Sequence, residues 1–167
     1  MPDPLSSPEA YQAFIYALPN RYASIQQSKL VYIPSGSLFG RLDGMLFFAN
    51  KVMLCVMEIL NFELQAIASY GYEVSRSHID PATQDFPVAS QFCQPSFQAK
   101  NKLYWYDSFP HPHIPALAST HPHHKHVHPD IKHNRIPAPN ISFTRPNLPI
   151  LIEEIENISE TIRLSPE

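Results

Sequence analysis

Apolar positions recur at helical spacing at both ends of the chain. Tyr11, Phe14 and Leu18 follow a Ser7-Pro8-Glu9 start, where a hydroxyl cap precedes proline and an acid. Pro19-Asn20 is expected to end this helix, and residues 1–27 are expected to form a helical segment. A second apolar stripe with glutamates on its polar side predicts a closing helix over residues 147–164.

Between these segments, residues 28–107 change to short runs that favour β-structure. The runs are Lys29–Ile33, Ser37–Phe48, Val52–Phe62, Tyr70–Ser77 and Lys102–Asp107. Ala49-Asn50-Lys51 is typical of a hairpin turn, and connections this short favour antiparallel pairing. Residues 78–101 lack a sustained period and are expected to form a long loop.

The pattern predicts a single α+β domain over residues 1–167. We expect a curved, mainly antiparallel sheet packed by the N- and C-terminal helices. The remaining stretch, residues 108–146, is rich in histidine and proline, and we expect it to be extended and to lie at one rim.

Composition narrows the functional classes. Apolar residues make up 44% of the chain, enough for a core, yet no apolar run approaches the ~20 residues that span a bilayer. The N-terminus lacks the basic and apolar regions of a signal peptide, and the two cysteines are too few for a disulfide framework. We therefore expect a cytoplasmic protein without membrane contact. The net charge of −3 does not indicate a general nucleic-acid binder.

Eight of the nine histidines lie between Tyr104 and Arg135. Histidine has an unperturbed pKa near neutrality, so such a cluster indicates proton transfer, metal ligation or phosphate contact, unless it decorates a surface loop. If residues 123–128 are extended, His124 and His126 share one side and His123 and Lys125 the other. One strand then supplies two converging imidazoles. The third group must come from elsewhere in the chain, and the candidates are His111, His113, Asp107 and Glu58.

Glu58 is a carboxylate on an otherwise apolar strand face, which it shares with Val56 by alternation. Burying a carboxylate is costly unless it is paired or functional. Three interpretations are open: a functional role, emergence of the strand into solvent, or a cross-strand pair with Arg41 or Arg76.

Two chemistries fit the histidines, and a purely structural or binding role is the third alternative. In the first, a histidine pair divides acid and base roles at a phosphodiester while Lys125 or Arg135 holds the phosphate. The RNA 2′-hydroxyl is then the nucleophile, and no cofactor or metal is needed. In the second, two histidines and a carboxylate bind a transition metal that activates water.

Several short elements resemble the TumE-like toxin family of bacterial toxin–antitoxin systems. Trp105–His111 is similar to the family's Arg-Tyr-Asp-Asn-Ala-Pro-His element, and Pro122–Val127 resembles its Pro-His-His-Lys-His element. Asp43-Gly44, Leu54–Glu58 and Tyr70–Tyr72 occur upstream in the family's order, so the resemblance runs from about Leu38 to the closing helix. Trp105 departs from the family by replacing its arginine.

The resemblance implies a growth-inhibiting toxin with an RNA target and a small antitoxin partner that often carries a helix-turn-helix. The positions that match the family's site are Glu58, Tyr72, Tyr106, Asp107, His111, His123, His124, Lys125 and His126.

We therefore predict the toxin component of a type II system, a metal-independent ribonuclease. The predicted catalytic residues are His124 and His126 for acid/base work, Lys125 for the phosphate, His111, and Asp107 or Glu58 as orienting carboxylate. The predicted substrate contacts are Tyr106, Tyr72, Arg135 and His123. The alternative is a non-catalytic or metal-binding protein that acts through complex formation with a small partner.

Overall fold

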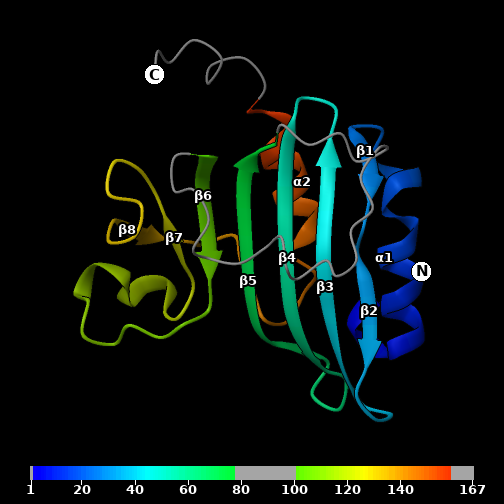
Figure 1. Ribbon diagram of the computed structural model, residues 1–167. Coiled ribbons are helices and arrows are strands. Elements are labelled where there is room, and N and C mark those ends of the chain that lie inside the picture. Colours follow the sequence, from blue (N-terminus) through cyan, green and yellow to red (C-terminus); the bar gives the residue numbers. More distant parts are fainter. Residues whose placement is uncertain (1, 78–100, 159–167) are drawn as a thin grey trace.

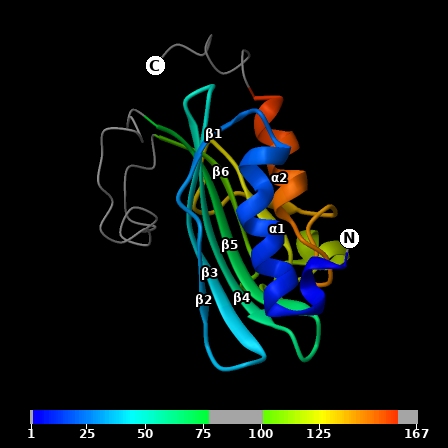
Figure 2. The same ribbon diagram turned by 90° about the vertical axis from the view of Figure 1, so that its right-hand side faces the viewer.

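The computed structural model describes residues 2–77 and 101–158, so the predicted loop 78–101 lies outside the described residues except for Asn101. The described chain forms one antiparallel eight-stranded sheet, with two helices against one of its faces (Figures 1 and 2). The strand order is β1-β3-β4-β5-β6-β7-β8, and β2 also pairs with β3. This arrangement confirms the predicted α+β class.

The elements follow the chain in a simple order. They are α1 (Pro8–Arg21), β1 (Ile25–Ser28), β2 (Val31–Pro34), β3 (Phe39–Phe48), β4 (Val52–Asn61), β5 (Ala66–Arg76), β6 (Lys102–Asp107), β7 (His124–His126), β8 (Arg135–Pro137) and α2 (Leu148–Glu156). The described residues also contain two short 3₁₀ helices, η1 (Pro4–Ser6) and η4 (Pro115–Thr120). The 108–146 segment, predicted to be extended, holds the helical turn η4 and the short strands β7 and β8.

Helix α1 begins as predicted, because the Ser7 side chain accepts a hydrogen bond from the Ala10 amide at 3.1 Å. It does not end at Pro19 but continues to Arg21, and the Tyr22 amide still donates to the Leu18 carbonyl. The helical segment is nevertheless shorter than residues 1–27. Ile25 opens strand β1 instead, since its backbone pairs with β3 and its side chain is buried.

The central hairpin forms where the sequence indicates. Strands β3 and β4 pair along their length, and Lys51 at the turn has a φ of 63°. Alternate β4 residues such as Leu54 and Val56 face the two helices and join Leu18 and Ile152 in the main core. The main core therefore lies between the sheet and the helices (Figure 2), and a smaller buried cluster of Met45, Phe47 and Cys55 lies on the other face of the sheet.

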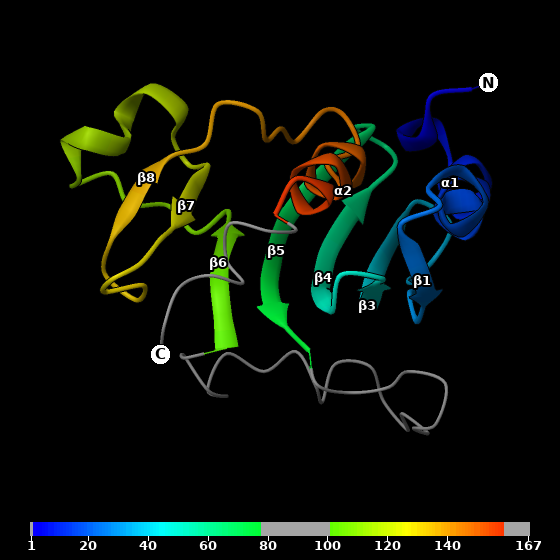
Figure 3. The same ribbon diagram turned by 90° about the horizontal axis from the view of Figure 1, so that it is seen from above.

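The last strands bring the histidine-rich segment onto the sheet. Strand β6 pairs with β5 on one side and with β7 on the other, and β7 pairs with β8 (Figure 3). In this register Asp107 lies opposite His124, and Trp105 lies opposite His126. None of the helices in the described residues has the length and apolarity to cross a membrane.

Candidate functional site

Asp107, His124 and His126 meet on the sheet face that points away from the helices. Successive strand residues point to opposite faces, and residues paired across two strands point to the same face. The Asp107↔His124 pairing therefore places the carboxylate beside the imidazole, and His126 joins them from two residues further along β7. The structure shows the alternation predicted for β7. The group that joins the two imidazoles, Asp107, comes from another strand, β6.

The three side chains converge on one point. His124 Nε2 lies 3.0 Å from Asp107 Oδ1, and His126 Nε2 lies 3.2 Å from Asp107 Oδ2. The two Nε2 atoms are 3.1 Å apart. Both imidazoles are buried, while the Asp107 side chain keeps 28% of its surface exposed. A small ligand can therefore reach the cluster from the Asp107 side.

Backbone carbonyls fix the orientation of both rings. His124 Nδ1 lies 3.0 Å from the Pro122 carbonyl oxygen, and His126 Nδ1 lies 3.0 Å from the Ile131 carbonyl oxygen. A carbonyl only accepts, so each Nδ1 carries the hydrogen. In the neutral rings each Nε2 then presents its lone pair to the other and to the Asp107 carboxylate, and a ring donates from Nε2 to Asp107 only when it is protonated.

The electrostatics follow from this geometry. Burial alone raises the pKa of the Asp107 carboxyl, but hydrogen bonds from His124 and His126 outweigh it and hold that pKa far below its ordinary range. Burial alone lowers the pKa of His124, but its bond to Asp107 raises the pKa above the ordinary value. The cluster thus favours an ionised carboxylate and a positive charge beside it.

His111 and Arg135 border the cluster. The His111 ring packs edge-on against His124, with centroids 4.9 Å apart and an interplanar angle of 74°. Burial lowers the pKa of His111, and the charge of Arg135 lowers it further. Arg135 pairs with His126 across β7 and β8, and its Nε is buried without a hydrogen-bond partner in the described structure. The charge of Arg135 therefore opposes protonation of His111.

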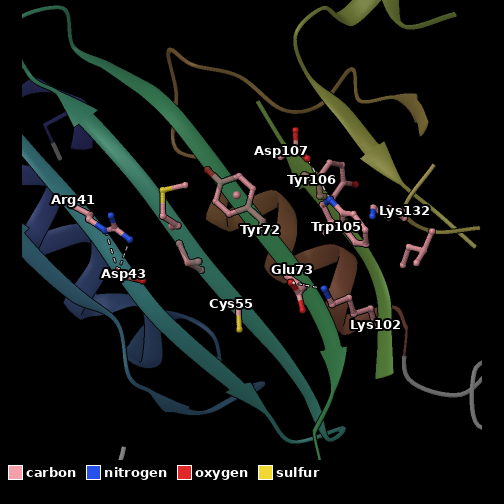
Figure 4. Close-up of a pocket in the computed structure, with 14 residues that line it drawn as sticks. Arg41, Asp43, Cys55, Tyr72, Glu73, Lys102, Trp105, Tyr106, Asp107 and Lys132 are labelled. Atoms are coloured by element: carbon pink, nitrogen blue, oxygen red, sulfur yellow. Dashed lines mark hydrogen bonds and ion pairs between the residues drawn. The ribbon is translucent and has the colours of Figure 1, made fainter. Parts of the chain in front are cut away.

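Trp105 extends the site into a groove on the same face. Its ring stacks on His126 with centroids 4.1 Å apart, and its Nε1–H donates to Asp107 Oδ2 at 3.3 Å. Figure 4 shows the groove, a cavity of about 600 Å³ whose lining includes Trp105, Asp107, Lys102 and Lys132. Lys102 pairs there with Glu73 at 3.4 Å. The groove thus joins the cluster to an aromatic surface and to cationic side chains.

Lys125 lies on the opposite face. Its Nζ is 2.6 Å from Glu154 Oε1 on α2 and 4.0 Å from the centroid of the Tyr104 ring. Tyr106 points the same way and donates its hydroxyl hydrogen to Glu154. The structure does not bring these two predicted site residues to the histidine cluster, because alternation along β6 and β7 turns them toward the helices.

The remaining predicted residues also lie on the helix side. Glu58 is 1% exposed and accepts hydrogen bonds from the Tyr11 and Tyr72 hydroxyls, the second at 2.6 Å. It bonds neither arginine suggested from the sequence and does not emerge into solvent. His123 Nδ1 lies 2.6 Å from the Tyr70 hydroxyl, and their rings stack. The side chains of Glu58, Tyr72 and His123 therefore make these hydrogen bonds within the fold and not with the histidine cluster.

Two contributors were not foreseen in the sequence. The sequence allows Trp105 to stack on bases or to join the strand core, and it does not indicate the contact seen in the structure, where the ring stacks on a cluster histidine. Glu154 was not singled out, yet it holds Lys125 and Tyr106. Alternation along β6 and β7 predicts which residues of each strand share a face. The register that places Trp105 opposite His126 depends on pairing between strands about twenty residues apart, and the sequence does not indicate it.

Comparison with known proteins identifies a family. The family model described as "Toxin TumE" matches residues 23–159, which include every described strand, helix α2 and the whole histidine cluster. No curated protein and no solved structure gives a significant match.

Proposed function

Since the chain belongs to the TumE toxin family, we propose that it is the toxin of a toxin–antitoxin pair and that it cleaves RNA. The observation that carries this proposal is the group of ionisable side chains at one end of an open groove. Asp107, His124 and His126 form a compact triad there, with His111 and Arg135 at its border. Acid, imidazole and cation within one site are the components of phosphodiester cleavage.

The geometry suggests how the roles are divided. In an in-line displacement the attacking and leaving oxygens lie on opposite sides of phosphorus, so two imidazoles that flank them stand roughly 6 Å or more apart. His124 and His126, with Nε2 atoms 3.1 Å apart, therefore act together on one side. His111, from a different segment, has its ring centroid 4.9 Å from that of His124 and is proposed to exchange the second proton with the substrate.

Arg135 takes the phosphate role that the sequence offered to either Lys125 or Arg135. A guanidinium beside the triad can form two hydrogen bonds with a phosphate and stabilise the charge that develops on it. Lys125 is held by Glu154 on the other face and is proposed to act only in folding. No metal is required by this division of roles.

The groove supplies the path for the nucleic acid. Single-stranded RNA binds proteins through base stacking on aromatic rings combined with a cationic surface. The partly exposed Trp105 and the charge of Lys132, which both line the groove, are proposed to provide these contacts beside the triad (Figure 4). RNA is therefore proposed as the substrate, with one base against Trp105.

The test is RNA cleavage by the purified chain with matched histidine variants. We expect His111→Gln and Arg135→Gln to lower the cleavage rate about 100-fold or more. His113→Gln is the control, since His113 is an exposed neighbour of His111 outside the triad. Growth and RNA integrity in cells that express each variant give a second readout. Equal RNA integrity for all four proteins, with equal growth, would refute the nuclease.

The antitoxin is proposed to cover an exposed apolar surface at the other end of the sheet. Val31 and Ile33 on β2, Phe39 at the start of β3 and Leu38 just before it expose 43–47% of their surface. Contiguous exposed apolar residues are typical of interaction sites. This surface also favours the alternative function, complex formation without catalysis. Tight antitoxin binding by a chain that leaves RNA intact would support that alternative.

A further inference from the structure

We propose that Asp107, His124 and His126 bind one divalent transition-metal ion, for which zinc is the best candidate. The three residues offer one ligand atom each, and these atoms all lie within 4.8 Å of one another. The site rests on the proposed function only for its substrate, because an ion there would face the same phosphate. With the ion bound, His124 and His126 would act as ligands in place of exchanging protons. Binding of the ion itself does not depend on RNA cleavage.

The first argument is the convergence of acceptors. Both Nδ1 atoms donate to carbonyls, so both Nε2 lone pairs and the Asp107 carboxylate point into one space. Three acceptors at distances of 3.0–3.2 Å repel one another unless a cation or a shared proton lies between them. Fixing each ligand imidazole through an Nδ1–H bond to a carbonyl is also the usual arrangement around protein-bound metals.

The second argument is the spacing of the ligand atoms. Ligands about 2.1 Å from an ion lie about 3.0 Å apart at adjacent octahedral positions and about 3.4 Å apart in a tetrahedron. The two Nε2 atoms are 3.1 Å apart, and each lies 3.0–3.2 Å from one of the two Asp107 carboxylate oxygens. These neighbouring separations fall in the interval expected for ligands of one ion.

The surroundings determine the kind of ion. Two imidazoles and one carboxylate suit zinc and neighbouring transition metals, whereas Mg²⁺ and Ca²⁺ prefer oxygen ligands. The triad leaves coordination positions open on the side of Asp107, the most exposed ligand. The positive charge of Arg135 opposes the ion to some degree, but it also favours an anionic oxygen as the next ligand. A phosphate oxygen of the proposed substrate can bind the metal ion and also interact with the guanidinium of Arg135.

The test is metal binding by the full chain, purified without a histidine tag and stripped with a chelator. Titration calorimetry with Zn²⁺ measures stoichiometry and affinity, and Co²⁺ reports coordination through its visible absorption. We expect one Zn²⁺ per chain, and binding at least 100-fold weaker in Asp107→Asn and His126→Gln. Mg²⁺ is expected not to compete with Zn²⁺.

His133→Gln is the matched control. It removes another histidine that contacts a carboxylate, since His133 Nδ1 lies 3.1 Å from Asp130, but this pair is exposed. We expect its affinity for Zn²⁺ to be unchanged. No stoichiometric binding by the wild type, or equal weakening in His133→Gln and Asp107→Asn, would overturn the site. Circular dichroism of the stripped variants separates lost binding from lost folding, and Asp107→Asn, at a partly exposed position, carries the result if His126→Gln does not fold.

A cleavage assay in the same preparations keeps the two proposals apart. Zn²⁺ bound by a chain that leaves RNA intact supports the metal site and contradicts the nuclease. RNA cut equally fast after stripping, by a chain that binds no Zn²⁺, supports the nuclease and contradicts the metal site.

Discussion

The ammonium group of Lys125 lies 2.6 Å from Oε1 of Glu154, which ties strand β7 to helix α2 on the side away from the histidine triad. Lys125 stands between His124 and His126 in the sequence, so a single extended strand sends neighbouring side chains to opposite faces of the sheet. The middle residue therefore stabilises the packing of α2, while the residues on either side of it form the candidate site.

Replacing Lys125 tests this division. We expect Lys125→Met to leave RNA cleavage within about 3-fold of wild type and to lower the free energy of unfolding by about 1 kcal/mol, since it loses a partly exposed ion pair and a cation–π contact with Tyr104. Urea unfolding and the cleavage assay measure the two effects. Glu154→Gln removes the other charge of the ion pair, and it should also lower the free energy of unfolding. A large loss of cleavage in stable Lys125→Met would restore the phosphate role predicted from the sequence.

Glu58 provides a prediction about pH. Burial raises the pKa of the Glu58 carboxyl, although hydrogen bonds from Tyr11 and Tyr72 lower it in part. A pKa raised on folding means that the folded chain holds the proton more tightly. The contribution of Glu58 to the free energy of unfolding is thus largest below the unfolded pKa of about 4.3, and it is lost as pH rises through the pKa of the folded state.

Glu58→Gln removes this titration. We expect the stability of the variant relative to wild type to increase as pH rises above about 4, as measured by urea unfolding across pH. Glu58→Ala is the contrast, because it leaves the Tyr11 and Tyr72 hydroxyls buried without their acceptor and should cost about 2–4 kcal/mol. A relative stability of Glu58→Gln that declines with pH would contradict the raised pKa.

Gly44 in β3 has a φ of 133°, and a Cβ there would overlap the Lys29 carbonyl. We expect Gly44→Ala to lower the free energy of unfolding by about 3 kcal/mol or more, through both the backbone conformation and the clash. Gly36 is the control, since it also has positive φ, 74°, but its Cβ would meet nothing within 4 Å. Gly36→Ala should therefore cost about 1 kcal/mol. If Gly44→Ala and Gly36→Ala lower the free energy of unfolding equally, as measured by thermal or urea unfolding, the close approach of the Lys29 carbonyl does not affect stability.

Trp105 is expected to hold His126 in place. Trp105→Phe keeps an aromatic ring against the imidazole, and we expect RNA cleavage within about 5-fold of wild type. Trp105→Ala removes both the stacking and the Nε1–H bond to Asp107, and a loss of 10- to 100-fold is expected, as for groups that orient a functional imidazole. Cleavage rates measured alongside Zn²⁺ affinity show whether both depend on the ring. A cleavage rate of Trp105→Ala equal to that of wild type would show that Trp105 does not contribute to the site.

The sequence by itself determined the two helices, the central strands and the identity of the central histidines. Capping at Ser7, the turn at Lys51 and the apolar alternation of β4 are local properties, so they predict α1, the central hairpin and the buried strand face. Alternation also placed His124 and His126 together, because the two-residue period of a strand depends only on its backbone.

Only the tertiary structure decided which residues from distant segments complete the site. Asp107 joins the histidines, and Glu58 does not, because the β6–β7 register and the faces of β4 and β5 are set by pairing across the sheet. The same pairing turned Lys125 and Tyr106 toward Glu154. Register is a cooperative result of packing one sheet face against two helices, and no short stretch of sequence contains it.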